Sequence, residues 1–420
     1  MRSRIATLLL LFFAGRSAAH EIPAPPTTSR PNIRTITAFV RIDPVHYRDE
    51  LAEAQGFLSE ARAAFAAEGW GVESVRITTQ PFPEYVAGLS PDAALSLLLD
   101  LDALAVEGGY GLDIGPGMRA DGDDPGMLLL LERFLAVAQT TNASVHLVAS
   151  RNNAPQIQWG VVREAVKVIR FLSQNSPEGQ ANFNFAATAV VEPYSPFYPA
   201  SWHDGPGRQF AIGLESAGVI GQVFAATGYD PASAGPRLAA ELLAHAAAVE
   251  GIARGVESRT RYSYLGIDTT PAPFDEVASI GAALESFTGG PLGTSGTLTG
   301  AAVVTQVVRS LPIKRVGLEG LFLPVLEDSR IALRFGEGRL SIDSLLSYSS
   351  VCGTGLDTLP LPGEVSDDQL AKIVGDVASL AAKWQKPLTA RLLPVPGRTA
   401  GETTQFESPF LTNTVLQPLP

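Results

Sequence analysis

Apolar and polar residues follow two alternating rhythms along most of the chain. Residues 33–42 alternate with a period of two and are rich in β-branched side chains, which predicts a strand. Residues 47–69 carry apolar side chains at helical spacing and end at a glycine, which predicts a helix. Residues 72–79 predict a second strand. The chain therefore begins its folded part with a strand, a helix and another strand.

The same succession continues toward the C-terminus. Helical spacing recurs at 92–106, 128–139, 159–174, 232–254, 295–309 and 367–384, and β-rich runs occur at 144–149, 182–191, 210–214, 261–267, 320–325 and 387–393. Strands separated by helices favour parallel pairing with right-handed crossovers. The number of such units predicts a closed α/β barrel, with a large doubly wound sheet as the alternative.

The N-terminal segment has the parts of a secretory signal. Arg2 and Arg4 precede a short apolar run, and Ser17, Ala18 and Ala19 supply the small residues that a signal peptidase requires. The apolar run is shorter than the ~20 residues needed to span a bilayer. Cleavage would place the protein outside the cytoplasm, and without it the protein would stay cytoplasmic. These features divide the chain into a signal peptide (1–19), a Pro-rich linker (20–31) and one α/β barrel domain (32–420).

Composition narrows the range of partners. The chain has 420 residues, of which 45% are hydrophobic, so it contains enough apolar material for a large core. Its formal net charge is −12 and no basic stripe offsets this, which disfavours a nucleic-acid partner. Only one cysteine is present, so an internal disulfide and a thiolate metal site are both excluded. We expect a small-molecule ligand and no membrane span, and the oligomeric state is left open.

Acidic side chains follow three of the predicted strands. Glu215 and Ser216 follow one strand, Asp268 the next, and Glu327 and Asp328 a third. In a barrel the carboxyl ends of the strands carry the active site, so these acids are candidates for proton transfer. Glu215, Asp268 and Asp328 are also candidates to hold a divalent metal. The alternative is that they cap helices, because Asp and Ser are preferred at helix N-termini.

A glycine-rich segment surrounds the single cysteine. Cys352 is followed by Gly353 and Gly355, which allow close backbone approach and could turn amide groups toward a ligand, and then by Asp357 and Thr358. We predict that Cys352 acts as nucleophile or acid with Asp357 as its partner. A buried, inert cysteine in a packed turn is the alternative.

Two further residues complete the predicted site. Arg391 lies on a late strand and is a candidate clamp for an anion. His203 lies in an aromatic and proline-rich segment after a strand, which is typical of a pocket wall. An ordinary loop histidine is the alternative for His203. No nucleophile elbow and no dinucleotide fingerprint are present.

Several longer stretches resemble a known family of proteins. They are Asn182-Phe-Asn-Phe-Ala186, Pro196-Phe-Tyr-Pro-Ala-Ser-Trp-His203, Phe210-Ala-Ile-Gly-Leu-Glu-Ser-Ala217, Leu323-Pro-Val-Leu-Glu-Asp-Ser329, Val351-Cys-Gly-Thr-Gly-Leu-Asp-Thr358 and Ala390-Arg-Leu-Leu-Pro-Val-Pro-Gly397. With these stretches the chain resembles domain-of-unknown-function family 711, also called uncharacterised protein family 0210. The resemblance extends over most of residues 32–412.

The resemblance implies a ten-stranded α/β barrel of the glycyl-radical-enzyme type, as in pyruvate formate-lyase and the large subunit of ribonucleotide reductase. It does not imply their chemistry. Cys352 resembles the finger-loop cysteine of those enzymes in its placement, and Gly401 is a weak match to a glycyl-radical position.

Three functions remain open at this point. The first is an enzyme acting on a small polar molecule at the barrel mouth, with a hydrolase, a lyase and an isomerase all compatible. The second is a non-catalytic protein that binds a small molecule in the same pocket. The third is a variant radical enzyme. The sequence identifies no cofactor beyond the divalent metal that the three acids would hold.

Overall fold

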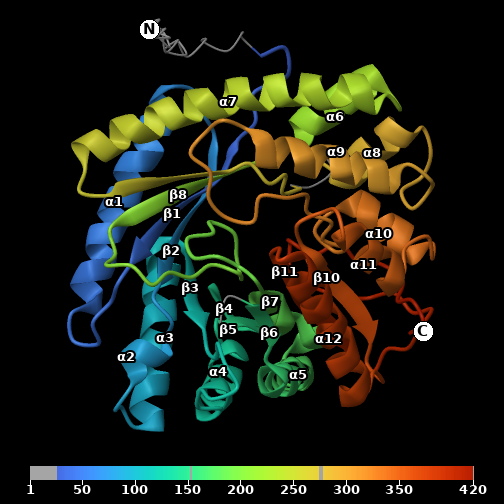
Figure 1. Cartoon of the computed structure of the whole chain (residues 1–420). Coiled ribbons are helices and arrows are strands. Elements are labelled where there is room, and N and C mark those ends of the chain that lie inside the picture. The colour runs from blue at the N-terminus through green and yellow to red at the C-terminus, as the bar shows by residue number, and fades with distance from the viewer. Residues whose placement is uncertain (1–25, 152–153, 274–277, 420) are drawn as a thin grey trace, which may run out of the picture.

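A nine-stranded sheet forms the centre of the molecule (Figure 1), in a computed structural model that describes residues 26–151, 154–273 and 278–419. The predicted signal peptide and the first part of the linker lie outside the described residues. The strands are β10 (Gly355–Pro362), β11 (Leu388–Val395), β7 (Phe185–Ala189), β4 (Thr141–His146), β3 (Gly111–Pro116), β2 (Val72–Thr79), β1 (Ile33–Val40), β8 (Gln209–Leu214) and β9 (Ser263–Asp268), in this order across the sheet.

The sheet consists of parallel blocks that meet at antiparallel junctions. Strands β7, β4, β3, β2 and β1 run parallel to one another. The pairs β8–β9 and β10–β11 are also parallel, but β8 is antiparallel to β1 and β11 is antiparallel to β7. The prediction of an α/β fold with a mostly parallel sheet is confirmed, and the two antiparallel junctions were not predicted.

Helices cover the outer face of this sheet. Buried apolar side chains of β1, such as Ile36 and Ala38, join one continuous core with the helices, and every residue of β1 except Arg34 is buried. Helices α5 and α12 begin and end at the residues that the sequence predicted. The helices are α1 (Tyr47–Ala67), α2 (Pro83–Val86), α3 (Pro91–Gly108), α4 (Gly126–Leu135), α5 (Trp159–Gln174), α6 (Ala217–Thr227), α7 (Pro231–Arg259), α8 (Ile280–Thr288), α9 (Thr297–Ser310), α10 (Ser329–Gly336), α11 (Ile342–Ser349) and α12 (Asp367–Trp384), with a 3-10 segment η1 (Pro177–Asn184) and a hairpin of β5 (Val148–Arg151) and β6 (Ala154–Ile157).

The connection from β7 to β8, residues 190–208, covers the inner face of the sheet. Its Tyr198 hydroxyl donates to the carbonyl of Ile77 at 2.6 Å, and its Ser201 hydroxyl lies 2.6 Å from that of Thr78. Phe197 of the same segment packs against Phe322 from the later part of the chain. We call residues 190–208 the inner loop. Together with residues from the later part of the chain they form a second, smaller core.

Residues 314–326 make backbone contacts with both outermost strands of the sheet. Ile267 of β9 donates to Lys314 at 2.8 Å, and Val316 donates back to Ile267 at 3.3 Å. At the other end of this segment the carbonyl of Leu321 accepts from the amide of Gly353 at 3.0 Å. The amide of Val325 donates to the carbonyl of Asp357 in β10 at 2.9 Å. The predicted strand at 320–325 is thus an extended connection, bonded on the β10 side but outside the nine-stranded ladder.

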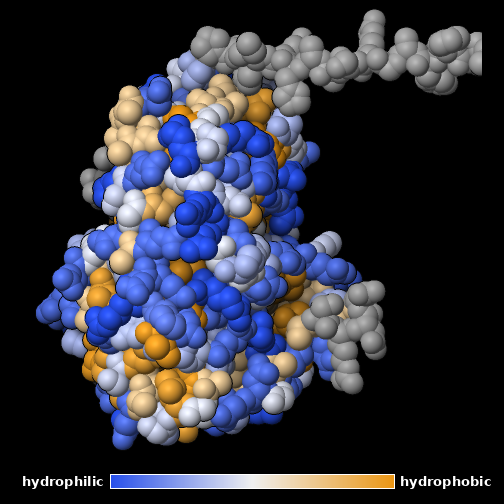
Figure 2. Space-filling model, turned by 90° about the vertical axis from the view of Figure 1, so that its left-hand side faces the viewer, coloured by the Kyte–Doolittle hydropathy of each residue, from blue (hydrophilic) through white to orange (hydrophobic). Residues whose placement is uncertain are grey.

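The described end of the linker docks on the outside of helix α7. Glu241 accepts hydrogen bonds from the backbone and hydroxyl groups of Thr27 and Thr28, at 2.8 and 3.0 Å for the two amides. The face seen in Figure 2 is mostly polar, and its apolar residues form small separate groups. Within the described part of the chain no helix is both long and apolar enough to cross a membrane.

Candidate functional site

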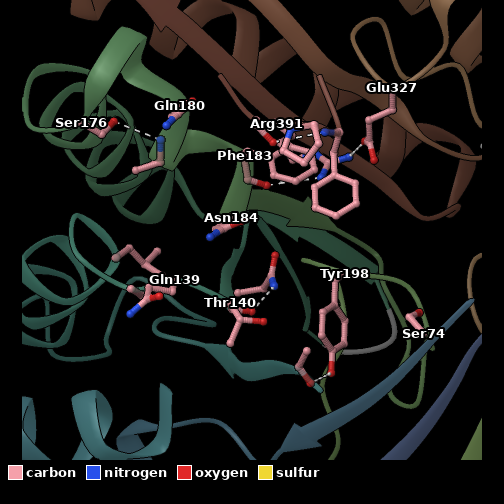
Figure 3. A pocket seen from close by; sticks show the side chains of 18 of the residues that line it. Ser74, Gln139, Thr140, Ser176, Gln180, Phe183, Asn184, Tyr198, Glu327 and Arg391 are labelled. Atoms are coloured by element: carbon pink, nitrogen blue, oxygen red, sulfur yellow. Dashed lines mark hydrogen bonds and ion pairs between the residues drawn. The ribbon is translucent and has the colours of Figure 1, made fainter. Parts of the chain in front are cut away.

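A cavity of about 790 Å³ opens at one edge of the sheet (Figure 3). Its charged wall is built from Arg34, Glu73, Arg76, Glu327 and Arg391. The remaining lining is polar, aromatic or small, and comprises Ser74, Gly111, Leu135, Ala136, Ala138, Gln139, Thr140, Asn142, Ser176, Pro177, Gln180, Ala181, Phe183, Asn184, Tyr198, Ser408, Pro409 and Phe410. A cavity of this size is in the range of small-molecule sites.

The topology places this cavity at one edge of the sheet. Leu214 at the end of β8 pairs with Ile33 at the start of β1, because the two strands are antiparallel. The amino ends of β1 to β4 therefore lie at the same edge as the carboxyl ends of β8 and β9. The rule that catalytic groups gather at carboxyl ends of strands applies only to the later part of this sheet.

Glu73, Arg34 and Glu215 form a charged cluster at this edge. Arg34 donates to Glu73 across a 2.9 Å ion pair, and both side chains are largely buried. Glu215 lies behind Glu73, is 8% exposed, and shares a hydrogen bond with it. Burial and the neighbouring Glu73 carboxylate raise the pKa of Glu215 to about 9. Glu215 is therefore protonated at neutral pH.

Arg391 joins two acids in a second charged group of the cavity. Its guanidinium donates to Asp357 at 2.7 Å and forms a second ion pair with Glu327. It also lies 4.9 Å from the ring centre of Phe183. Burial raises the pKa of Glu327, and Arg391 opposes this shift. The predicted residues Glu327 and Arg391 line the cavity, while Asp357 supports Arg391 from behind.

Arg76 differs from the other two arginines of the cavity. Its guanidinium lies 4.7 Å from the ring centre of Tyr198 and donates to the carbonyl of Pro196 at 3.3 Å. Among the residues that the structure describes, no carboxylate forms an ion pair with Arg76. Loss of hydration, and then the nearby Arg34, lower its pKa to about 10. Arg76 therefore presents a positive charge to the cavity that the cavity's own acids leave unpaired.

The other side of the cavity is lined by uncharged polar groups (Figure 3). Asn142 donates to the carbonyl of Thr140 at 3.1 Å, so its amide nitrogen is engaged while its oxygen faces no described donor. Gln180 and Asn184 of η1 have no described side-chain hydrogen bond, and the Gln180 Oε1 atom is buried. The cavity thus has a charged side and an amide side.

The remaining acids predicted from the sequence hold loops together. Asp268 is fully buried and accepts from the amides of Thr270 at 2.9 Å and Leu318 at 2.7 Å. Burial raises its pKa to about 6. Ser216 donates to the carbonyl of Thr269 at 3.0 Å, which ties the ends of β8 and β9 together.

Asp328 caps two helices at once. It accepts from Arg330 and Ile331 in the first turn of α10, at 3.0 and 3.1 Å. It also accepts from Ser279 and Ile280 at the start of α8, both at 2.7 Å. In the described residues no three His, Cys, Asp or Glu side chains are arranged to hold a metal ion. The structure therefore does not bring the predicted metal ligands Glu215, Asp268 and Asp328 into one donor set.

Cys352 lies in a packed turn after helix α11. Its side chain is 0% exposed, and its Sγ atom lies 3.9 Å from the Ser349 hydroxyl. Lys386 holds this turn by donating to the carbonyls of Ser349 and Cys352. Cys352 is not among the residues that line the cavity, so the structure separates the thiol from the ligand space. Gly401, the weak match to a radical position, is an exposed turn residue with a φ of +90°.

The predicted glycines and their neighbours serve close backbone contacts. A Cβ on Gly353 would lie 2.6 Å from the Cα of Gly320, and one on Gly355 would lie 2.3 Å from the carbonyl oxygen of Thr389. Thr358 accepts from the amide of Leu326 at 3.1 Å. These residues join 314–326 to β10 and its neighbours, and none of them lines the cavity.

His203 belongs to the inner loop and is buried. Its Nε2 atom lies 3.0 Å from the carbonyl oxygen of Val40, and its ring contacts Phe39 and Tyr194. Val40 is at the end of β1 and Arg34 near its start, so His203 lies at the opposite edge of the sheet from the charged cluster. Burial lowers the pKa of His203, which keeps its ring neutral.

Sequence reasoning missed Arg34, Glu73, Arg76 and the amide side. The first three lie in segments that were correctly predicted as strands, Arg34 and Glu73 near the amino ends and Arg76 in the middle of β2. Strands buried on both faces rarely carry charged residues unless those charges are paired or face a cavity. Charged positions inside such strands were therefore the available signal.

Comparison with known proteins places the chain in a family. The family described as Uncharacterised ACR (DUF711) matches residues 27–407. The chain belongs to this family. Relatives named UPF0210 protein are 30% identical in Pyrobaculum arsenaticum over 80% of this chain and 76% of the relative, and 27% identical in Desulforudis audaxviator over 89% and 88%. The UPF0210 protein of Lacticaseibacillus casei is 26% identical over 73% of this chain and 68% of the relative.

Membership in DUF711 confirms the resemblance drawn from the sequence. The match covers all the charged residues of the cavity wall, from Arg34 to Arg391. The family is uncharacterised, so its name assigns no reaction to the cavity.

Proposed function

We propose that this DUF711 protein is an enzyme that binds a small organic anion in the cavity and transfers a proton to or from it. The observation that carries the proposal is Arg76, a guanidinium on the cavity wall without a carboxylate partner among the described residues. A buried or half-buried charge is costly without a counter-charge. An anionic group of the ligand would supply that counter-charge.

The proton-transfer step rests on the Glu73–Glu215 pair. Glu73 lines the cavity, and burial together with the neighbouring Glu73 carboxylate raises the pKa of Glu215 behind it. A carboxyl group whose pKa lies near or above neutrality is suited to general acid–base catalysis. Arg34, paired with Glu73, would orient the carboxylate toward the ligand. The cysteine takes no part in this scheme, because it does not line the cavity.

Proton exchange tests the chemistry even while the natural substrate is unidentified. The purified protein is incubated in D₂O with a panel of small carboxylates, and proton NMR follows the loss of each C–H signal. We expect exchange on at least one compound, about 10²-fold slower or more in Glu215→Gln. Arg76→Met should abolish exchange by preventing binding, whereas Arg237→Met on the exposed side of α7 should not change it.

Two outcomes would count against the proposal. Exchange that is equally fast in Glu215→Gln would remove the carboxyl pair from the reaction. Binding of a panel compound through Arg76 without any exchange would instead favour a non-catalytic binding protein.

The closure of the sheet into a barrel belongs to the same proposal. We propose that residues 314–326 act as a tenth strand that joins β9 to β10 and closes the sheet into a barrel. The hydrogen bonds of Lys314 and Val316 with β9, and of Val325 with β10, support this closure. A closed barrel would enclose the cavity and the inner loop in one low-dielectric interior, where charge interactions are stronger than in water.

We also propose that the protein is exported. The basic start, short apolar run and small residues of 1–19 support this. The mass of the protein recovered from its natural host should correspond to cleavage after Ala19. An intact N-terminus in the cytoplasm would contradict export.

A further inference from the structure

The amide side of the cavity allows the ligand class to be narrowed, and this inference rests on the proposed function. Gln180 and Asn184 lie on the side of the cavity away from Glu327 (Figure 3), and Asn142 also lines the cavity. Gln180 and Asn184 are carried by η1, and Asn142 by β4, so three separate positions contribute the same chemical group. Within the described chain the side chains of Gln180 and Asn184 have no hydrogen-bond partner.

Unpartnered amides in a half-buried wall are unusual. Most buried polar atoms in proteins are hydrogen-bonded, and one left unsatisfied costs about 1–3 kcal/mol. The Gln180 Oε1 atom is buried without a partner. A ligand that donates and accepts hydrogen bonds would satisfy these groups, because a carboxamide does both.

The charged residues of the cavity limit the class of ligand further. Glu73 and Glu327 line the cavity together with Arg76, so a second anionic group on the ligand would be repelled. Carboxylates accept hydrogen bonds and would pair with hydroxyl groups of a ligand. Hydroxyls therefore fit both the acids on one side and the amides on the other.

We infer that the ligand is a polyhydroxylated monoanion, of the class of sugar acids, with its anionic group on Arg76 and its hydroxyl chain along Asn142, Gln180 and Asn184. The cavity of about 790 Å³ is large enough for a six-carbon molecule of this class. The three amide residues bind the ligand and perform no chemical step.

A pair of six-carbon probes tests the inference. Calorimetric titrations of the full chain compare gluconate with hexanoate, which has the same length and charge but no hydroxyl groups. We expect gluconate to bind at least tenfold more tightly than hexanoate. Gln180→Leu and Asn184→Leu should reduce this ratio toward one by weakening gluconate alone, and Gln306→Leu, an exposed amide on α9, should leave it unchanged.

The variants separate this inference from the proposed function. Arg76→Met should weaken gluconate and hexanoate by the same factor, because both carry the anionic group. Hexanoate binding as tightly as gluconate would overturn the polyhydroxylated class and leave anion binding by Arg76 in place. Failure of both probes to bind the wild-type protein would overturn the inference, whereas the proposed function is overturned only when no carboxylate of the wider panel binds.

Discussion

Glu215 shows at the scale of one residue how burial prepares a group for chemistry. It is 8% exposed and faces another carboxylate, so its protonated form is stabilised. A solvated carboxylate would remain ionised at neutral pH and would be a poor acid. The position of Glu215 behind Glu73, rather than its residue type, gives it this property.

The raised pKa of Glu215 predicts a pH dependence of stability. Between about 4.5, the ordinary value, and about 9, the folded protein holds one more proton than the unfolded chain. The stabilisation that protonated Glu215 gives the folded protein is therefore complete below about pH 4.5 and is lost as the pH rises toward about 9. Urea unfolding from pH 5 to 9 should show the wild-type free energy falling, relative to Glu215→Gln, by up to about 1.4 kcal/mol per pH unit.

Glu60→Gln provides the control for this prediction. Glu60 is exposed on helix α1, so its substitution should leave the pH profile parallel to that of the wild type. Parallel profiles for the wild type and Glu215→Gln would show that Glu215 is ionised in the folded protein, and would contradict the acid role.

At the same scale, the sequence predicted some members of the site and missed others. Glu327 was predicted from the end of a strand and Arg391 from its position on a late strand, and both line the cavity. Arg76 was overlooked because it lies inside a predicted strand, whereas the rule about carboxyl ends concerns the residues that follow a strand. Arg76 lines the cavity because β2 lies between β1 and β3 in the sheet and the inner loop places Tyr198 against it, and no local pattern encodes these neighbours.

Single side chains also organise whole elements, and Asp328 is the clearest case. One buried carboxylate accepts hydrogen bonds from the first turns of α8 and α10, where unpaired amides and the helix dipoles favour a negative charge. Helix capping, the alternative that the sequence offered for this acid, describes its contact with α10. The link to α8 depends on the tertiary fold.

We therefore predict that Asp328→Ala is strongly destabilising. It leaves several buried donors unsatisfied, so the free energy of unfolding should fall by about 3 kcal/mol or more. Asp230→Ala removes an exposed cap from α7, and should cost less than Asp328→Ala. Urea denaturation of both variants measures the difference. Equal losses would show that the link between α8 and α10 contributes nothing.

The elements themselves were predictable where their periodicity was long and uninterrupted. Helices α5 and α12 have the predicted bounds, because many amphipathic residues define each of them. Strand β10 lies where the sequence predicts no strand, and it begins within the glycine-rich segment that follows Cys352. Tertiary pairing with β11 outweighs the local preferences of this segment.

The contact between Gly320 and Gly353 predicts the cost of separating 314–326 from β10. A Cβ on Gly320 would lie 2.5 Å from the Cα of Gly353, so Gly320→Ala forces the backbones apart. We expect a loss of about 1–3 kcal/mol in the free energy of unfolding. Gly56→Ala is the control: its Cβ meets nothing within 4 Å in helix α1, and it should stabilise by about 0.5–1 kcal/mol. A harmless Gly320→Ala would contradict the close approach.

At the scale of the whole molecule, the inner loop and 314–326 decide whether the cavity is enclosed. Hydrogen exchange measures this directly. The amides of Ile267, Val325 and Gly353 donate between 314–326 and its neighbours, so a closed barrel predicts that they exchange as slowly as amides of central strands. Exchange as fast as that of exposed turns would show an open sheet.

The molecule as a whole combines a fold that its sequence largely predicts with a site that it predicts only in part. The strands and helices are predictable because hydrophobic periodicity depends only on residues that are close together in the sequence. The cavity depends on which strand ends meet, and on an inner loop whose Tyr198 lies against Arg76. Neither relation is local, so both required the folded structure.

Anion binding by Arg76 is the central claim, and calorimetric titration of a panel of small carboxylates tests it most directly. We expect at least one anion to bind the wild type and Arg237→Met with the same dissociation constant. It should bind Arg76→Met at least tenfold more weakly, a difference of about 1.4 kcal/mol. Equal affinity in Arg76→Met, or no binding of any anion to the wild type, would contradict an anion site at Arg76.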